Sequence, residues 1–80
     1  MDDELDAVAG ELARMISHQR QKVFDLAARL RPGLTEDDLT QPHDYPELRE
    51  NWHWNYEDGV LAGLLAAELT IRRGRRKVAP

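Results

Sequence analysis

The sequence predicts an all-α protein, built as a long two-helix hairpin with a partly helical, aromatic-rich connector. Apolar residues recur at alternating spacings of four and three through the first 30 positions, which is typical of a helix with one apolar seam. Pro32-Gly33 then ends that pattern, and a second apolar run occupies residues 60–71. A chain of 80 residues makes one domain at most. We therefore assign residues 1–73 to one helical domain and treat residues 74–80 as a mobile basic tail.

The first helix is expected over residues 3–31, with Asp2 or Asp3 as its N-terminal cap. Its seam is formed by Leu5, Ala9, Leu12, Ile16, Gln19, Val23, Leu26 and Leu30, and Val8, Met15 and Ala27 widen it on one side. The one polar member of the seam is Gln19. We expect Gln19 to reach water at a widened point; the alternative is a polar contact across a bundle that sets the register.

Residues 32–54 form a connector too long for a plain hairpin loop, so it should have structure of its own. Thr35-Glu36-Asp37-Asp38 resembles a capping box that starts a short helix over residues 36–40. A second helical turn follows, with Asp44 as its cap and Pro46 near its first position.

Most of the aromatic residues lie in or next to this connector: Tyr45, Trp52, Trp54 and Tyr56. Tryptophan buries about 200 Å², so we expect a packed aromatic plug. Together with Leu34, Leu39 and Leu48, the plug would close the end of the hairpin against Phe24, Leu26 and Leu30. The alternative is an exposed aromatic patch that binds a partner or ligand.

The second helix, over residues 55–73, has more apolar surface than one neighbour can cover. One stripe, including Val60, Leu64 and Ala67, should pack against Leu12, Ile16, Val23 and Leu26 of the first helix. A second stripe, displaced by about 100°, comprises Leu61, Leu65 and Leu69, with Ala62 beside it. Burying this second stripe in another copy would make a homodimeric four-helix bundle.

Small residues also recur along the second helix, at Gly59, Gly63, Ala66 or Ala67, and Thr70. Glycine inside a helix costs about 1 kcal/mol relative to alanine, so we expect another backbone to approach closely there. The apolar run of 12 residues is too short to span a membrane, which requires about 20. With 32% charged and 41% hydrophobic residues, the composition is that of a folded soluble domain.

Charge is distributed unevenly along the chain. Residues 1–71 contain 15 acids and six bases, whereas residues 72–80 contain five bases and no acid. The five bases are Arg72, Arg73, Arg75, Arg76 and Lys77. We expect a solubilising tail or one that folds onto an acidic face of the assembly; the alternative is binding to a polyanion such as nucleic acid.

Few residues offer chemistry. The chain has no cysteine, which excludes disulfides and thiolate zinc sites. The only serine, Ser17, points about 100° away from its neighbour His18 on the helix, so the two make no nucleophile–base pair. A divalent metal could be held by His43, Asp44 and Glu57, with His18 as a further candidate.

The sequence therefore favours a non-enzymatic, homo-oligomeric interaction or scaffold module with no cofactor. The alternatives are a small metal- or ligand-binding bundle and a nucleic-acid accessory protein that acts through the basic residues. The acidic start, Met1-Asp2-Asp3-Glu4, is unlike a basic secretory leader, so we expect a cytoplasmic protein.

Overall fold

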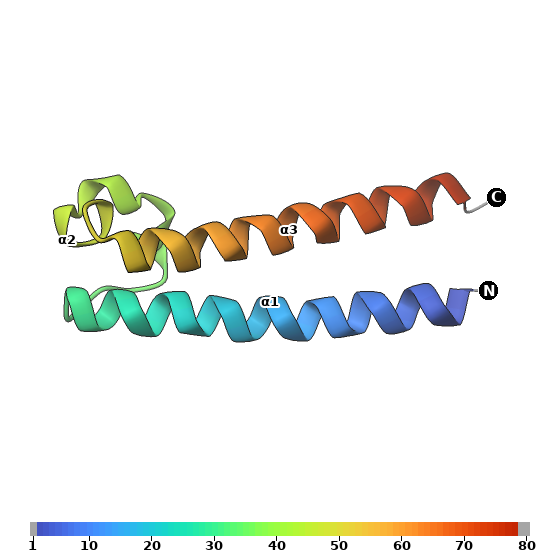
Figure 1. Ribbon diagram of the computed structural model, residues 1–80, viewed down its shortest axis with the longest axis horizontal. Coiled ribbons are helices and arrows are strands. Elements are labelled where there is room, and N and C mark those ends of the chain that lie inside the picture. The colour runs from blue at the N-terminus through green and yellow to red at the C-terminus, as the bar shows by residue number, and fades with distance from the viewer. Residues whose placement is uncertain (1, 79–80) are drawn as a thin grey trace.

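The computed structural model describes the backbone of residues 2–78 and the side chains of residues 4–74. Two long helices, α1 (Asp2–Leu30) and α3 (Trp52–Val78), lie antiparallel, so that the start of α1 and the end of α3 are at the same end of a rod (Figure 1). The connector closes the opposite end with the 3₁₀ helices η1 (Asp37–Thr40) and η2 (Pro42–Asp44) and the short helix α2 (Pro46–Arg49). The predicted all-α fold is confirmed, and no strand occurs among the residues described.

The seam of α1 faces α3, as its periodicity predicts. Leu12, Ile16, Gln19 and Val23 are buried, and the other four seam residues, Leu5, Ala9, Leu26 and Leu30, are half-buried. The helix ends one residue earlier than expected, with a hydrogen bond from the Arg31 N–H to the Ala27 carbonyl. Gly33 then takes a φ of 93°, which only glycine adopts easily, and the chain turns there.

The connector contains the short helices that the sequence predicts near residues 36–40 and after Pro46. The backbone N–H of Thr35 donates to the Asp38 carboxylate at 2.8 Å, and the Asp38 N–H donates to Thr35 Oγ1 at 3.4 Å. This reciprocal pair confirms the capping box. The predicted cap of α2 is wrong: Tyr45, not Asp44, precedes Pro46 at that position, and its side chain makes no capping bond.

Helix α3 begins three residues before the predicted position. The cause is a cap that the sequence analysis missed: the Asn51 side-chain oxygen accepts a hydrogen bond of 2.8 Å from the Trp54 N–H. The Asn55 side chain extends this anchoring by donating to the carbonyls of Leu48, Arg49 and Asn51. The start of α3 is thereby tied to the end of α2.

The predicted aromatic plug is half right. Trp54 is 2% exposed and belongs to the core cluster, and its indole N–H donates to the Val23 carbonyl at 3.2 Å. The rest of that cluster is Val23, Ala27, Leu34 and Leu48, with Leu26, Leu30, Leu39, Tyr45 and Leu61 packed against it. Trp52 and Tyr56, however, are 79% and 64% exposed. Because they lie four residues apart on a helix, they share one face, and Trp54 points to the other.

Helix α3 extends beyond residue 73, where the second helix was expected to end and the basic tail to begin. Helix α3 continues through Gly74 to Val78, since Gly74 keeps a negative φ and no proline interrupts the segment before Pro80. The side chains of Arg75, Arg76 and Lys77 lie outside the residues whose side chains are described, as do residues 79–80 entirely.

The open half of the hairpin, the half away from the connector, leaves most of its apolar side chains partly or fully exposed. Within Val60–Ile71, the run predicted to be buried, no residue is fully buried. Val60 and Leu64 are half-buried as expected for hairpin packing, but Ala67 is exposed. Leu61, predicted to lie at an oligomer interface, instead packs against the core of the hairpin, because it follows Trp54 by two helical turns on the same side.

The two tryptophans should differ sharply in their contribution to stability. Replacing the buried Trp54 by alanine is expected to lower the free energy of unfolding by about 3–5 kcal/mol, because it empties the centre of the core. Trp52→Ala, at an exposed position of the same helix, should change it by less than about 0.5 kcal/mol. Urea unfolding followed by circular dichroism measures both, and similar losses would contradict the assignment of the core.

Candidate functional site

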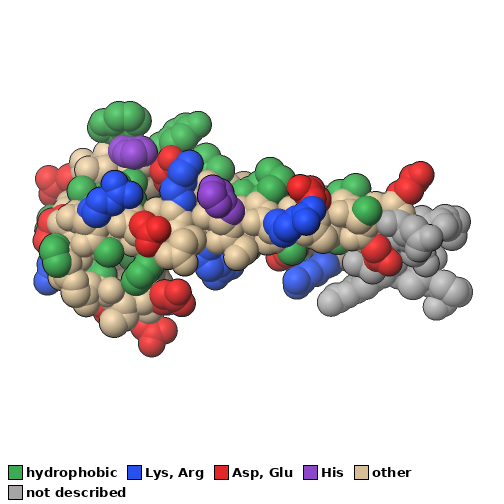
Figure 2. Space-filling view, turned by 90° about the horizontal axis from the view of Figure 1, so that it is seen from below, with side chains coloured by type: hydrophobic (Ala, Val, Ile, Leu, Met, Phe, Trp, Pro, Cys, Tyr) green, Lys and Arg blue, Asp and Glu red, His purple; other side chains and the backbone are tan. Residues whose placement is uncertain are grey.

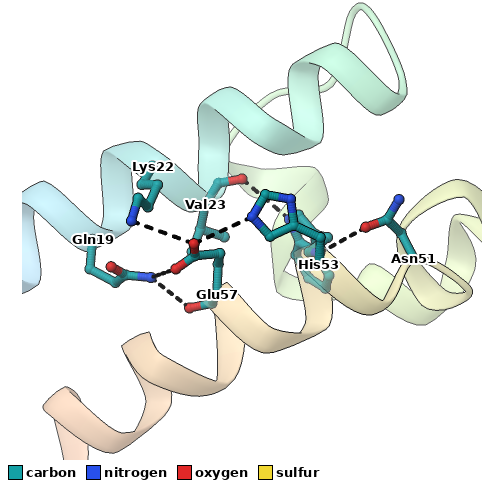
Figure 3. Close-up of polar contacts among 7 residues, drawn as sticks. Gln19, Lys22, Val23, Asn51, His53 and Glu57 are labelled. Atoms are coloured by element: carbon teal, nitrogen blue, oxygen red, sulfur yellow. Dashed lines mark hydrogen bonds and ion pairs between the residues drawn. The ribbon is translucent and has the colours of Figure 1, made fainter.

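The most connected polar group of the hairpin is a cluster at mid-rod formed by Gln19, Lys22, His53 and Glu57 (Figure 3). The Gln19 side-chain amide donates to the Glu57 backbone carbonyl at 2.8 Å and to the Glu57 carboxylate at 2.9 Å. Lys22 Nζ and His53 Nε2 lie 3.4 and 3.5 Å from the other carboxylate oxygen. The four side chains thus join α1 to α3.

Gln19 does not reach water, contrary to our expectation. It is 7% exposed and contacts Glu57, which is itself 8% exposed. The contact joins the two helices of one chain. The alternative prediction, a Gln19 contact across a bundle of two copies, is therefore not what the structure shows either. The sequence signal was Gln19, the one polar residue of the α1 seam, but nothing local indicated that it meets Glu57, which is 38 positions away.

Electrostatics favour the ionised form of Glu57. The hydrogen bond from Gln19 holds the pKa of this carboxyl below its usual value, and the positive charge of Lys22 and the hydrogen bond from His53 act in the same direction, against the opposing effect of burial. A carboxylate in this state accepts hydrogen bonds and holds two helices together. It has no proton to donate near neutral pH.

Asp58, the next residue, behaves in the opposite way. Partial burial raises the pKa of its carboxyl. Asp58 lies at a hollow between α1, η1 and α3 that is lined by Arg20, Phe24, Leu39 and Leu61 among others. The Thr40 hydroxyl also lines this hollow, where it donates to the Asp37 carbonyl at 2.8 Å.

The structure does not assemble the predicted metal ligands. His43 and Asp44 lie on η2, whereas Glu57 lies within α3 and already binds Gln19, Lys22 and His53. Among the described residues, no group of three or more histidine and acidic side chains is placed to hold an ion. His18, the further candidate, is exposed on α1.

Of the predicted polyanion-binding residues, two have described side chains. Arg72 and Arg73 are both exposed, and Arg72 lies 3.6 Å from Glu68 one turn earlier on α3. The Glu68–Arg72 pair borders a groove that also includes Ala9, Leu12, Ala13 and Ile71.

Exposed apolar side chains are the other notable feature of the surface, and Figure 2 shows hydrophobic side chains standing along one long edge of the rod. On one flank, Val8, Leu12, Met15, Ala67 and Ile71 line a groove between α1 and α3, with Glu11 beside them. Val8 and Met15 are about half exposed, at 52% and 50%. The sequence predicts that both residues widen the α1 seam on one side, and about half of each side chain remains exposed there.

The other flank carries most of the predicted oligomer interface. Leu65 and Leu69 are 37% and 48% exposed, and Ala62 is exposed beside them. The small-residue ridge is also open: a Cβ atom at Gly59 or Gly63 would meet no atom within 4 Å. The close backbone approach expected there does not occur within one chain.

Comparisons with protein-family models, with curated proteins and with solved structures found no match to this chain. None of the described helices combines the length and apolarity needed to cross a membrane. The surface and the polar cluster therefore provide the evidence for function.

The Glu57 cluster should make the hairpin sensitive to acid. Because the folded state lowers the pKa of Glu57, its stabilising contribution is complete above the ordinary glutamate pKa of 4.5 and is lost as the pH falls through the lowered value. Wild-type protein should therefore lose stability as the pH falls below the ordinary glutamate value of 4.5, and Glu57→Gln should lose less over the same range. Urea unfolding midpoints at each pH measure this.

The matched control is Glu50→Gln, which removes an exposed carboxylate paired with the neighbouring Arg49. Its acid dependence should follow that of the wild type. If both variants lost stability with pH in the same way, Glu57 would not be the group responsible.

Proposed function

We propose that the chain is a non-enzymatic helical interaction module whose working form is a homo-oligomer, with two hairpins forming a four-helix bundle. The observation that carries the proposal is the exposure of α3: its most apolar run, Val60–Ile71, contains no fully buried residue. Apolar surface of this extent drives association in water.

The shape of the single chain supports the same conclusion. The rod measures 47 × 20 × 18 Å, with a radius of gyration of 15.5 Å, where a compact chain of this length would have about 12 Å. Its accessible surface is 6043 Å², whereas a compact monomer of 9.2 kDa has about 4,900 Å². The excess, about 1,100 Å², is comparable to the roughly 800 Å² that each partner buries in a standard interface.

A scaffold role fits the arrangement of the described polar side chains, because the members of the central cluster are engaged with one another. Glu57, Lys22, Gln19 and His53 bind one another and hold α1 and α3 together. Of the exposed large apolar side chains, Val8 and Met15 lie on one flank of the open half and Leu65 and Leu69 on the other, whereas Trp52 and Tyr56 lie toward the connector end. Either flank can contribute to an assembly without disturbing the core at the connector end.

Self-association is tested by sedimentation equilibrium and light scattering of the whole chain between about 1 µM and 1 mM, the range of weak to moderate affinities. We expect a mass of at least two copies of the 9.2 kDa chain at the upper end. The melting temperature should rise with protein concentration, because association stabilises the folded state by mass action. A folded chain that remains monomeric at 1 mM, with a constant melting temperature, would overturn the proposal.

A further inference from the structure

We propose that a second copy of this chain docks antiparallel in the groove lined by Val8, Leu12, Met15, Ala67 and Ile71, so that α1 pairs with α1 and α3 with α3. The inference rests on the proposed self-association and specifies its surface and direction. The copies overlap through their open halves, and the two connectors lie at opposite ends of the assembly.

The groove differs from the opposite flank in having an uncharged floor contributed by both helices. Val8 and Met15 of α1 are half exposed above it, and Ala67 and Ile71 of α3 complete it. Its only charged neighbour, Glu11, is paired with Arg14 and remains largely exposed, so it can stay at the rim. The opposite flank instead has the Glu68–Arg72 pair within its groove, and burying that pair would cost desolvation.

The groove is complementary to itself under a two-fold rotation. With the axis between residues 11 and 12 of α1, Val8 of one copy faces Met15 of the other. The same axis passes near residues 65 and 66 of α3, because the contacts Gln19–Glu57 and Val23–Trp54 place residues whose numbers add up to 76 or 77 at the same level of this antiparallel pair. Val60 then faces Ile71, and Leu64 faces Ala67. Each large side chain meets an apolar partner, as an isologous interface requires.

Charge favours the same arrangement. Residues 36–50 contain six acids and one arginine, and a parallel bundle would place these two acidic connectors side by side. The antiparallel bundle separates them by the length of the assembly.

The surface is tested by paired charge substitutions. Val8→Glu with Met15→Glu should weaken self-association at least about 100-fold, because two carboxylates would be buried without partners. Leu65→Glu with Leu69→Glu, on the opposite flank, should change it less than about threefold, within the range of near-neutral interface substitutions. Ser17→Glu, on the exposed outer face of α1, controls for added charge. Circular dichroism establishes that each variant is helical.

The direction is tested by engineered disulfides, since the natural chain has no cysteine. Glu11→Cys places a thiol beside the proposed axis, so oxidation should yield a covalent dimer at concentrations where the wild type associates. A parallel bundle sets α1 against α3 of the other copy and would keep the two thiols apart. Ser17→Cys is the matched control on the same helix, and it should remain reduced under the same conditions.

Each outcome has a distinct meaning. Wild-type protein that stays monomeric overturns the proposed function and this inference together. An oligomer that survives the Val8/Met15 substitutions but not those at Leu65 and Leu69 overturns only the inference and assigns the interface to the other flank. An oligomer lost with Val8 and Met15 but not linked through Glu11→Cys overturns the antiparallel direction.

Discussion

The packing of α3 against α1 through a single seam is the constraint on which the rest of the structure depends. The α3 side of that seam consists of Trp54, Glu57, Leu61, Leu64, Glu68 and Ile71, each three or four residues from the next, and all are buried or half-buried. Two helices can cover only one face of each other. Yet α3 has no charged residue from Gly59 to Ala67, on any face. Its composition therefore calls for more neighbours than a hairpin supplies.

The two halves of the rod differ in how far their apolar side chains are covered. At the connector end, Leu34, Leu48 and Tyr45 add a third layer over the helices and enclose Trp54. At the open end, the structure describes no such layer over residues 4–16 and 62–74, and Leu12 and Ile16 are the buried residues among them. The main core cluster therefore lies at the connector end, although Trp52 and Tyr56 remain exposed there. Local opening should begin at the open end, where fewer apolar contacts resist it.

Periodicity predicted the elements of this fold well, because the α1 seam and the apolar run of α3 are long and regular. Capping chemistry likewise predicted the turn that starts at Thr35. The exposure of Trp52 could not be predicted, because it depends on where α3 begins, and that position is set by the Asn51 cap. The candidate site was missed for another reason. Periodicity shows which residues share a face, but it does not show which distant residue, such as Glu57 for Gln19, meets that face.

The contact between Gln19 and Glu57 also determines how α3 is aligned along α1. Sliding one helix by a turn, about 5.4 Å, would still bring most aliphatic side chains against aliphatic neighbours. It would move the Glu57 carboxylate to the level of Ile16 or Val23, where no amide is available to solvate it, and an ionised group stranded in this way is costly. The hydrogen bond from the Trp54 indole N–H to the Val23 carbonyl depends on the same alignment. Together, these two polar contacts favour a single register of α3 along α1.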